Sequence, residues 1–307
     1  MHDKKSQLTS LKIAVVGIPG GWSSEQLADA VAARTGTRIL IDITRIEARL
    51  LTGEVLYDGI DLTSLDGIIV KKIHSVYSPA DLERLEILRY LQQRGVSIFS
   101  NPEKILRLIS RLACTVTLRN TGIPMPETVI TEDVELARAA VQRMGHAVFK
   151  PLFSTKARGM VVVSSADDDL QKNIDEFKQQ NTVMYIQKMV DIPGRDLGVV
   201  FLGGRYLATY ARQGNKDSWN TTINSGGHYV AHEPSAEILE MAEMAQAPFS
   251  LDFTCVDVVE TSEGPMVFEV SAFGGYRGLQ DAHAINAAEL YTNYVIEQLN
   301  ERLSGVA

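Results

Sequence analysis

Two carboxylates in the last third of the chain have the spacing of a metal site on paired strands. Asp257 is central in the apolar run FTCVDVVE, Glu269 is central in MVFEVS, and the turn TSEGP separates the two runs. If the strands pair through that turn, both side chains can point to one face. A buried acid needs a cation or donor, and Mg²⁺ takes one or two carboxylates plus phosphates. The pair therefore predicts a metal-phosphate site; alternatively, the acids face solvent on an edge strand or pair with arginine.

A lysine followed by a basic loop could hold the phosphates of such a site. Lys150 closes the apolar strand pattern HAVFKPL, directly before the polar turn FSTKARGM. A lysine at a strand end can bind phosphate oxygens, and the loop adds backbone N–H groups, Lys156 and Arg158 as donors. The alternative is a snorkelling lysine beside a plain hairpin. The loop is not a Walker motif.

The elements that must position these residues begin with an α/β unit. LKIAVVG, at residues 11–17, ends in a Gly/Pro turn and precedes an amphipathic stretch over residues 23–34, which is typical of a strand followed by a helix. RILIDI, DGIIVKKI and VSIF are further β-rich runs, and a helical pattern covers residues 81–94. This alternation predicts a parallel sheet flanked by helices, and we place the unit at residues 1–100.

Two further units are predicted after Asn101, where the alternation of short strands and helices ends. A helical stretch over residues 102–121 ends at TGIPMPET, whose glycine and two prolines enforce an extended connector. Strands at 128–130, 147–151, 160–164 and 183–187 and helices at 132–144 and 166–180 form a unit placed at 101–188. Long β-segments joined by hairpin turns, a helix at 235–247 and a final helix near 282–302 form a third unit at 189–307.

Composition and charge exclude several classes of function. The 307-residue chain is 45% hydrophobic and 22% charged, as in ordinary globular proteins. The net charge is −8 and both signs are interspersed, so the sequence shows no basic cluster that would bind nucleic acid or anionic lipid. No run of eighteen apolar residues occurs and the opening MHDKKSQLTS is polar, so a cytoplasmic protein is expected. Cys114 and Cys255 are expected to be buried thiols.

Nine motifs, taken in order, resemble those of the RimK-like ATP-grasp ligases. They are NP at Asn101, GIPMPET at Gly122, FKPL around Lys150, YIQKMV at Tyr185, GRDLGVVFLGG at Gly194, ATYAR at Ala208, SWNTTINSGG at Ser218, CVDVV at Cys255 and FEVSAFGG at Phe268. The resemblance covers roughly residues 95–285, and FEVSAFGG is also similar to a subgroup, the ATP-grasp protein of the GAK system. It implies an α/β (α+β) ATP-grasp fold with an amino-terminal Rossmann-like pre-grasp domain, a small central lid domain and a carboxy-terminal, mainly antiparallel sheet domain.

The resemblance also implies how ATP is bound. Lys150 binds the phosphates, and a loop covers them with Ser154, Lys156, Arg158 and Gly159. The backbone of a hinge reads the adenine edge, and the hinge residues are Gln187, Lys188 and Met189. Asp196 accepts from the ribose hydroxyls.

The resemblance further implies that Arg212 is catalytic and stabilises the charge of the acyl-phosphate and tetrahedral states. Asp257 and Glu269 hold Mg²⁺ between the β- and γ-phosphates. These roles match the requirements of phosphoryl transfer, which needs positioning and charge neutralisation more than covalent chemistry from the protein.

Three positions depart from the family pattern. The family usually has an asparagine two residues after the metal-binding glutamate, on the strand that we call the metal strand (residues 266–271), and here Ser271 occupies that place. The serine side chain is shorter and a weaker oxygen ligand, which puts the binding of a second Mg²⁺ in doubt. Ser154 and Ala157 stand at glycine-like positions of the phosphate loop, which restricts close backbone approach. The adenine-side segment, which usually has an arginine and an asparagine near a tryptophan, here reads WNTT from Trp219 to Thr222, which removes one cation and one amide from the site.

The glycine-rich segment AFGGYRGLQD, at residues 272–281, directly follows the metal strand and is the expected substrate loop. Arg277, with Tyr276 beside it, is the residue expected to bind a substrate carboxylate, because a guanidinium matches a carboxylate bidentately. The alternative is a surface arginine on a mobile turn. Lys71, Lys72 and His74 follow a strand end and could reach the same cleft, although solvated charges are the simpler interpretation.

The leading hypothesis is an ATP- and Mg²⁺-dependent carboxylate-amine ligase that acts on small-molecule or peptide-like substrates through an acyl phosphate. One alternative is an ATP-grasp kinase that phosphorylates a hydroxyl group. Another is a non-catalytic nucleotide sensor, suggested by Ser271 and the glycine-poor loop. No nucleic acid or membrane partner is expected, and a homo-oligomer is compatible with the sequence.

Overall fold

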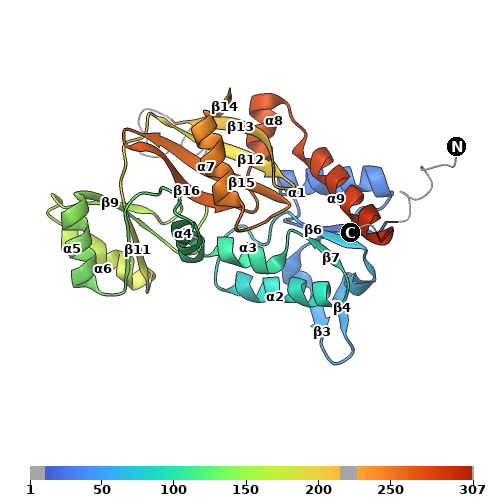
Figure 1. The fold of residues 1–307 in the computed structure, drawn as a ribbon. Coiled ribbons are helices and arrows are strands. Elements are labelled where there is room, and N and C mark those ends of the chain that lie inside the picture. The colour runs from blue at the N-terminus through green and yellow to red at the C-terminus, as the bar shows by residue number, and fades with distance from the viewer. Residues whose placement is uncertain (1–10, 215–226, 306–307) are drawn as a thin grey trace.

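A parallel four-stranded sheet forms the amino-terminal unit of the computed structural model, which describes residues 11–214 and 227–305 (Figure 1). Its spatial order is β2-β1-β6-β7, with β1 (Ile13–Val16), β2 (Leu40–Ile41), β6 (Gly67–Val70) and β7 (Ser97–Phe99). Ile13 and Val15 face a core built from α1 (Trp22–Thr35) and α9 (Ala287–Leu303), whereas Ala14 and Val16 face the core of α2 (Ala80–Gln93). Both faces are covered, which explains why these strands are continuously apolar.

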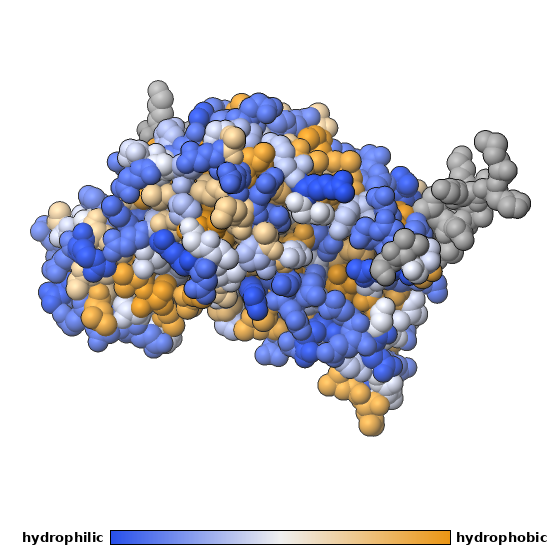
Figure 2. Space-filling model, in the orientation of Figure 1, coloured by the Kyte–Doolittle hydropathy of each residue, from blue (hydrophilic) through white to orange (hydrophobic). Residues whose placement is uncertain are grey.

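A small antiparallel sheet in this unit is absent from the predicted elements. It has the order β3-β4-β5, with β3 (Glu47–Arg49), β4 (Glu54–Tyr57) and β5 (Ile60–Asp61), and it is flanked by the 3₁₀ helices η1 (Ile43–Arg45) and η2 (Leu62–Ser64). The predicted strand RILIDI shrinks to two residues because the Asp42 side chain accepts from the Thr44 N–H and starts η1. The β3-β4 hairpin projects from the molecule, and Leu50 and Leu51 at its tip are 70% and 100% exposed (Figure 2).

The central unit is a four-stranded antiparallel sheet with two helices on one face. The order is β10-β9-β11-β8, with β8 (Thr128–Thr131), β9 (His146–Lys150), β10 (Val161–Ser164) and β11 (Met184–Lys188). Helices α5 (Val134–Met144) and α6 (Leu170–Gln180) pack against it and form a separate core around Phe149, Phe177 and Ile186. The unit therefore has its own core and stands apart at the left of Figure 1.

A five-stranded antiparallel sheet forms the carboxy-terminal unit. Its order is β14-β13-β12-β15-β16, with β12 (Arg195–Leu202), β13 (Arg205–Gln213), β14 (His228–His232), β15 (Phe253–Thr261) and β16 (Gly264–Ser271). Helix α7 (Ala236–Gln246) packs on β15 and β16. The cores of this sheet and of the amino-terminal unit are continuous, and α9 returns to pack on α1. These two units therefore share a core, unlike the central one.

One predicted helix is divided in the structure, and one predicted loop is helical. The stretch 102–121 forms α3 (Pro102–Ile109) and α4 (Arg111–Asn120), because Ser110 is extended (φ −85°, ψ 116°) and the Arg111 N–H donates to the Leu152 carbonyl. The expected glycine-rich loop becomes helical at α8 (Tyr276–His283), which ends at Ala284 in the left-handed conformation. Asn286 then caps α9. In both cases a backbone break that local propensity does not encode ends the first helix.

None of the helices in the described parts of the chain combines the length and the apolar character that crossing a membrane requires. The segment SWNTTINSGG, which includes Trp219 to Thr222, falls outside the described residues except for its last glycine.

Candidate functional site

A pocket of about 550 Å³ lies between the three units and is lined by most of the predicted site residues. Those lining it are Lys71, Lys150, Lys156, Gln187, Lys188, Met189, Asp196, Arg212, Asp257, Glu269, Ser271, Tyr276 and Arg277. Ser154 lines a neighbouring cavity of about 50 Å³ instead, and Arg158 and Gly159 line neither. Most residues predicted from the sequence therefore lie in one pocket, but fewer residues of the basic loop line it than were predicted.

A β-bulge brings the two candidate metal ligands opposite each other. Val258 pairs with Val267 after the hairpin turn, so regular pairing would set Phe268 opposite Asp257. The register shifts by one residue between Asp257 and Val258, and Asp257 pairs with Glu269. Directly opposed residues point to the same face, and both side chains line the pocket. The bulge thus creates the paired carboxylates that the sequence predicted.

Both carboxylates are held by arginines. Arg212 Nη2 lies 2.9 Å from Asp257 Oδ1, and Arg212 Nε donates to Asp196 Oδ2 at 2.9 Å. Arg111 Nη1 lies 3.0 Å from Glu269 Oε2. Burial raises the pKa of the Asp257 carboxyl, and the positive charge of Arg212 opposes that shift. The acids therefore face the pocket and pair with arginine at the same time, which joins two interpretations that the sequence left as alternatives.

Arg111 is a functional candidate that the sequence reasoning missed. It is the first residue of α4, and its guanidinium also donates to the Pro151 carbonyl at 3.2 Å and to Ser154 Oγ at 3.2 Å. It therefore connects the metal strand to the start of the basic loop. The helix break at Ser110 aims it there, and a helical pattern that runs across residues 102–121 gives no signal for that break.

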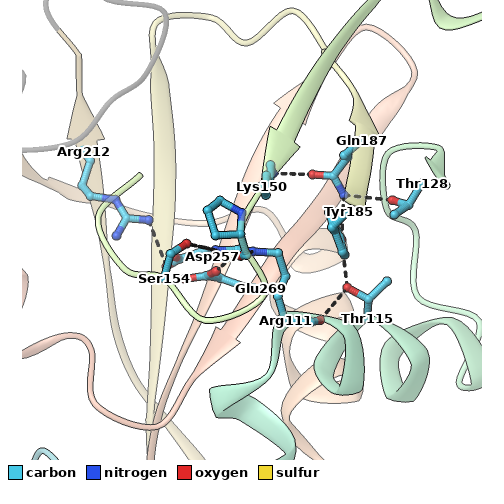
Figure 3. A network of polar contacts seen from close by, with 11 residues as sticks. Arg111, Thr115, Thr128, Lys150, Ser154, Tyr185, Gln187, Arg212, Asp257 and Glu269 are labelled. Atoms are coloured by element: carbon cyan, nitrogen blue, oxygen red, sulfur yellow. Dashed lines mark hydrogen bonds and ion pairs between the residues drawn. The ribbon is translucent and has the colours of Figure 1, made fainter. Parts of the chain in front are cut away.

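Lys150 is the end of a buried polar network that reaches into the pocket (Figure 3). Its Nζ donates to Gln187 Oε1, and Gln187 Nε2 donates to Thr128 Oγ1 at 3.1 Å and to the Tyr185 hydroxyl at 3.3 Å. Burial, together with the charge of Arg111, lowers the pKa of Lys150 to about 7, and the charge of Glu269 opposes that shift. The side chain is 9% exposed and so does not snorkel to solvent.

The basic loop contains strained backbone. Lys156 and Ala157 have φ angles of 58° and 57°, in the left-handed region, where a side chain costs roughly 1 kcal/mol. Arg158 Nη1 donates to the Ser75 carbonyl of the amino-terminal unit at 3.0 Å. The loop is therefore fastened across the pocket at its far end, with Lys156 lining the pocket.

The hinge predicted to read adenine already uses two of its N–H groups. The Lys188 N–H donates to the Glu127 carbonyl at 2.8 Å, and the Met189 N–H donates to the His146 carbonyl at 3.0 Å. The next residue, Val190, lines the pocket, and its N–H has no backbone acceptor among the described residues. A purine edge would therefore meet the hinge carbonyls and the Val190 N–H.

The pocket end at the amino-terminal unit contains a buried cation. Lys71 is 3% exposed, its Nζ donates to the Phe273 carbonyl at 2.7 Å, and it lies 3.9 Å from the centre of the Tyr276 ring. The interpretation as a solvated charge is wrong for Lys71, because the end of β6 lies beneath residues 273–276. Burial, together with the neighbouring charge of Lys72, lowers the pKa of Lys71 to about 7.

Two predicted substrate residues differ in how they are placed. The Tyr276 side chain is 4% exposed and packs against Phe253, and its hydroxyl has no partner within the described ranges. Arg277 stacks on the Trp22 ring, with its Cζ atom 4.0 Å from the ring centre, and has Asp281 at 4.0 Å. Arg277 therefore belongs to a helix and is fixed by stacking, whereas Tyr276 lies mainly in the core.

The donor set suits a magnesium-nucleotide complex. In residues 11–214 and 227–305 no group of three or more His, Cys, Asp or Glu side chains could hold a metal ion by itself. Asp257 and Glu269 supply hard oxygens, while Ser271 Oγ already accepts from the Phe273 N–H at 3.3 Å. Mg²⁺ binds through one or two carboxylates plus phosphate oxygens. These residues fit that mode of binding, in which the nucleotide completes the coordination.

The family model described as RimK-like ATP-grasp domain matches residues 110–295, more than half of the chain and the part that contains Arg111, Lys150, Arg212 and the two carboxylates. The chain belongs to the RimK-like ATP-grasp family. A tetrahydromethanopterin:alpha-L-glutamate ligase of Methanosarcina acetivorans is 25% identical in an alignment that covers 93% of this chain and 97% of that protein. A probable alpha-L-glutamate ligase of Maridesulfovibrio salexigens is 23% identical, with coverage of 89% and 91%.

Solved structures of the same fold cover nearly the whole ATP-grasp chain. The ATP-grasp ligase PsnB in complex with a minimal precursor superposes with a TM-score of 0.73 at 17% identity, covering 94% of this chain and 99% of PsnB. The D-cycloserine synthetase DcsG gives a TM-score of 0.72 at 14% identity, with coverage of 94% and 99%. The predicted family and ATP-grasp fold are confirmed. As a member of this family, the chain is an ATP-dependent ligase that forms C–N bonds, as predicted.

Proposed function

We propose that this ATP-grasp ligase uses ATP and Mg²⁺ to phosphorylate a substrate carboxylate and then joins the acyl group to the amine of an amino acid or peptide-like substrate. The observation that carries the proposal is the bulged β15-β16 pair, which sets Asp257 opposite Glu269 in the pocket that Lys150 and Arg212 also line. The relatives named alpha-L-glutamate ligase support an amino acid as one substrate. The proposed compartment, the cytoplasm, rests on the sequence alone.

Asp257 and Glu269 would hold Mg²⁺, which neutralises phosphate charge and orients the triphosphate when it is bound. Lys150 and Arg111 supply two more positive charges on the same side of the pocket. Arg111 makes its ion pair with Glu269 at 3.0 Å, so it is already positioned where phosphate oxygens would enter. The buried Lys150 ammonium gains a stronger, charged partner when phosphate binds, because its hydrogen-bond acceptor in the free protein is the neutral Gln187 amide.

The reaction needs two displacements. A carboxylate oxygen of the substrate attacks the γ-phosphorus, the bond between that phosphorus and the β-γ bridging oxygen breaks, and ADP leaves. The amine nitrogen then attacks the acyl carbon, the carbon-oxygen bond to phosphate breaks, and phosphate leaves with the electron pair while the nitrogen gives up a proton. Arg212, oriented by Asp196, donates to the oxygen that becomes negative in the second step.

The test uses hydroxylamine as a substitute for the amine. The protein is incubated with ATP, Mg²⁺, hydroxylamine and a panel of mono- and dicarboxylic acids, and ADP and hydroxamate are measured. Equal amounts of ADP and hydroxamate with one class of acid are expected. ADP release accompanied by phosphorylation of a hydroxyl group, with no hydroxamate, would indicate a kinase and contradict the proposal. ATP binding with no turnover on any substrate would indicate a nucleotide sensor.

A further inference from the structure

The pocket contains far more positive than negative charge. Among the described residues it is lined by eight basic side chains, namely Lys71, Lys72, Arg111, Lys150, Lys156, Lys188, Arg212 and Arg277. The acidic side chains that line it, in the same described parts of the chain, are Asp196, Asp257 and Glu269. The whole chain has a net charge of −8, so this excess is local. A local excess of cations in a pocket favours anionic ligands.

The acids neutralise only one end of the pocket. Asp257 and Asp196 pair with Arg212, and Glu269 pairs with Arg111. All three acids therefore lie at the end where the triphosphate and Mg²⁺ are proposed to bind. Within residues 11–214 and 227–305, no further acidic side chain lines the pocket to balance the end formed by the amino-terminal unit and α8.

Three cations lie at that other end. Lys71 and Lys72 follow β6, and both of their N–H groups donate to the Val16 carbonyl, at 2.8 and 3.2 Å. Lys71 has a carbonyl and an aromatic ring as neighbours, and within the described residues neither lysine has an acidic partner in a salt bridge. Burial lowers the pKa of Lys72, and the charges of Lys156 and Arg158 lower it further. Arg277 has Asp281 of its own helix at 4.0 Å.

The amino end of α1 adds backbone donors at the same place. Trp22 and Ser23 line the pocket, and the N-cap residue Gly21 has no side chain to bond them. Their N–H groups have no backbone acceptor in the described parts of the chain, while Glu25 is occupied by the Gly20 N–H and by Arg38. The first N–H groups of a helix and its positive dipole end bind anions. Because β1 ends next to β6, the fold places this helix end beside Lys71 and Lys72.

The geometry points to a second anion-binding subsite, formed by Lys71, Lys72, Arg277 and the amino end of α1, which selects a substrate carrying an anionic group in addition to the carboxylate that is activated. We call it the anion subsite. It rests on the proposed function, because the first anionic group is assigned to the ligase chemistry. The second group is a carboxylate or a phosphate, since both match a lysine pair, a guanidinium and helix N–H groups.

Desolvation makes the cations of the anion subsite unfavourable while they lack a counter-charge. Lys71 is almost fully buried, and a buried cation without a counter-charge is unfavourable unless a partner arrives. A monoanionic substrate would leave these cations unbalanced once its carboxylate moved to the γ-phosphate. A dianionic substrate balances both ends of the pocket at once.

The experiment compares butyrate, glutarate and 4-phosphonobutyrate, which differ at one end of the chain. Dissociation constants are measured by calorimetry at constant ionic strength, with and without Mg·ADP, for the wild-type protein and for Lys72→Ala. The control is Lys178→Ala, because Lys178 is a half-buried lysine of α6 that donates to the Thr182 carbonyl and does not line the pocket. Glutarate or 4-phosphonobutyrate is expected to bind at least about tenfold more tightly than butyrate, and the better of the two identifies the group.

Lys72→Ala is expected to reduce that preference by about tenfold, and Lys178→Ala is expected to preserve it. Equal affinities of the wild-type protein for all three anions would overturn the anion subsite, as would a preference that survives both Lys72→Ala and Arg277→Ala. Failure of Mg·ADP to bind would instead contradict the proposed function. The titrations without nucleotide report on the anion subsite in either case.

Discussion

The two ends of the pocket balance their charges in different ways. At the β15-β16 end, Asp257 and Glu269 each have an arginine partner, and the cations are held in place before any ligand arrives. At the β6 and α8 end, the partners of the Lys71 ammonium in the described part of the chain are the Phe273 carbonyl and the Tyr276 ring. A charge-balanced end is preorganised for a ligand that brings its own metal ion, whereas an unbalanced end depends on the ligand for its counter-charge. Single substitutions can therefore change one end of the pocket and leave the other intact.

The largest effect is expected from Asp257→Asn. The substitution keeps the shape of the side chain but removes the negative charge proposed to hold Mg²⁺, so ATP turnover should fall by at least about 100-fold while the fold is retained. ADP release measures the activity, and circular dichroism measures the fold. Glu260→Gln is the matched control, because Glu260 lies on the same strand but pairs with Arg195 at 2.8 Å and does not line the pocket. Equal turnover in both variants would contradict the metal site.

Arg111→Ala should weaken Mg·ADP binding by about 10- to 100-fold. The substitution removes a charged donor beside the phosphates and leaves Glu269 without its partner. Calorimetric titration of Mg·ADP measures the change. Arg119→Ala provides a control on the same helix, because Arg119 donates to the Met125 and Pro126 carbonyls away from the pocket. Nucleotide binding that does not distinguish the two variants would remove Arg111 from the site.

Lys71→Met should change how stability depends on pH in the ligand-free protein. The pKa of Lys71 is lowered from 10.5 to about 7 by burial, so between these values the unfolded chain binds more protons and the free energy of unfolding rises with pH. Methionine cannot titrate there. The free energy of unfolding of the variant should therefore exceed that of the wild type by the largest amount below pH 7, and the difference should disappear as the pH approaches 10. Denaturant unfolding at pH 6, 8 and 10 measures the difference, and a constant difference would show that Lys71 titrates normally.

Tyr276→Phe has the smallest expected effect. The Tyr276 hydroxyl is buried without a partner among the described residues, so its removal should leave the free energy of unfolding unchanged or raise it by about 1 kcal/mol. Ligase activity on an identified substrate should remain within about twofold, because the ring beneath Lys71 is retained. A large rise in KM with unchanged stability would instead assign the hydroxyl to substrate binding, as first predicted from the sequence.

The strands and the chemistry of the site follow from the sequence, but their exact pairing does not. The apolar runs around Asp257 and Glu269 predict two strands and a hairpin, because their pattern and the turn TSEGP are local signals. The one-residue bulge at Phe268 decides whether the two acids share a face, and it depends on packing between strands. Arg111 was missed for a similar reason, since the break at Ser110 is stabilised by the distant Leu152 carbonyl.

Burial separates the predicted site residues in a way that residue type cannot. Lys71 and Lys72 are adjacent lysines at a strand end, and either would be expected to reach solvent. The structure buries Lys71 because residues 273–276 fold over it after β16, at a distance of two hundred residues along the chain. Such contacts are set by the topology of the whole chain. The kind of ligand was therefore predictable, whereas the charge balance at each end of the pocket was not.

The most direct test of the metal site uses Mn²⁺ in place of Mg²⁺. Binding of Mn²⁺ is followed by electron paramagnetic resonance, with and without ADP, in the wild-type protein, Asp257→Asn and Glu269→Gln. Two carboxylates and a nucleotide together should hold the ion, so the wild-type protein is predicted to bind one Mn²⁺ tightly only when ADP is present, and each variant to lose it. Tight, ADP-dependent Mn²⁺ binding that persists in both variants would contradict the assignment of Asp257 and Glu269.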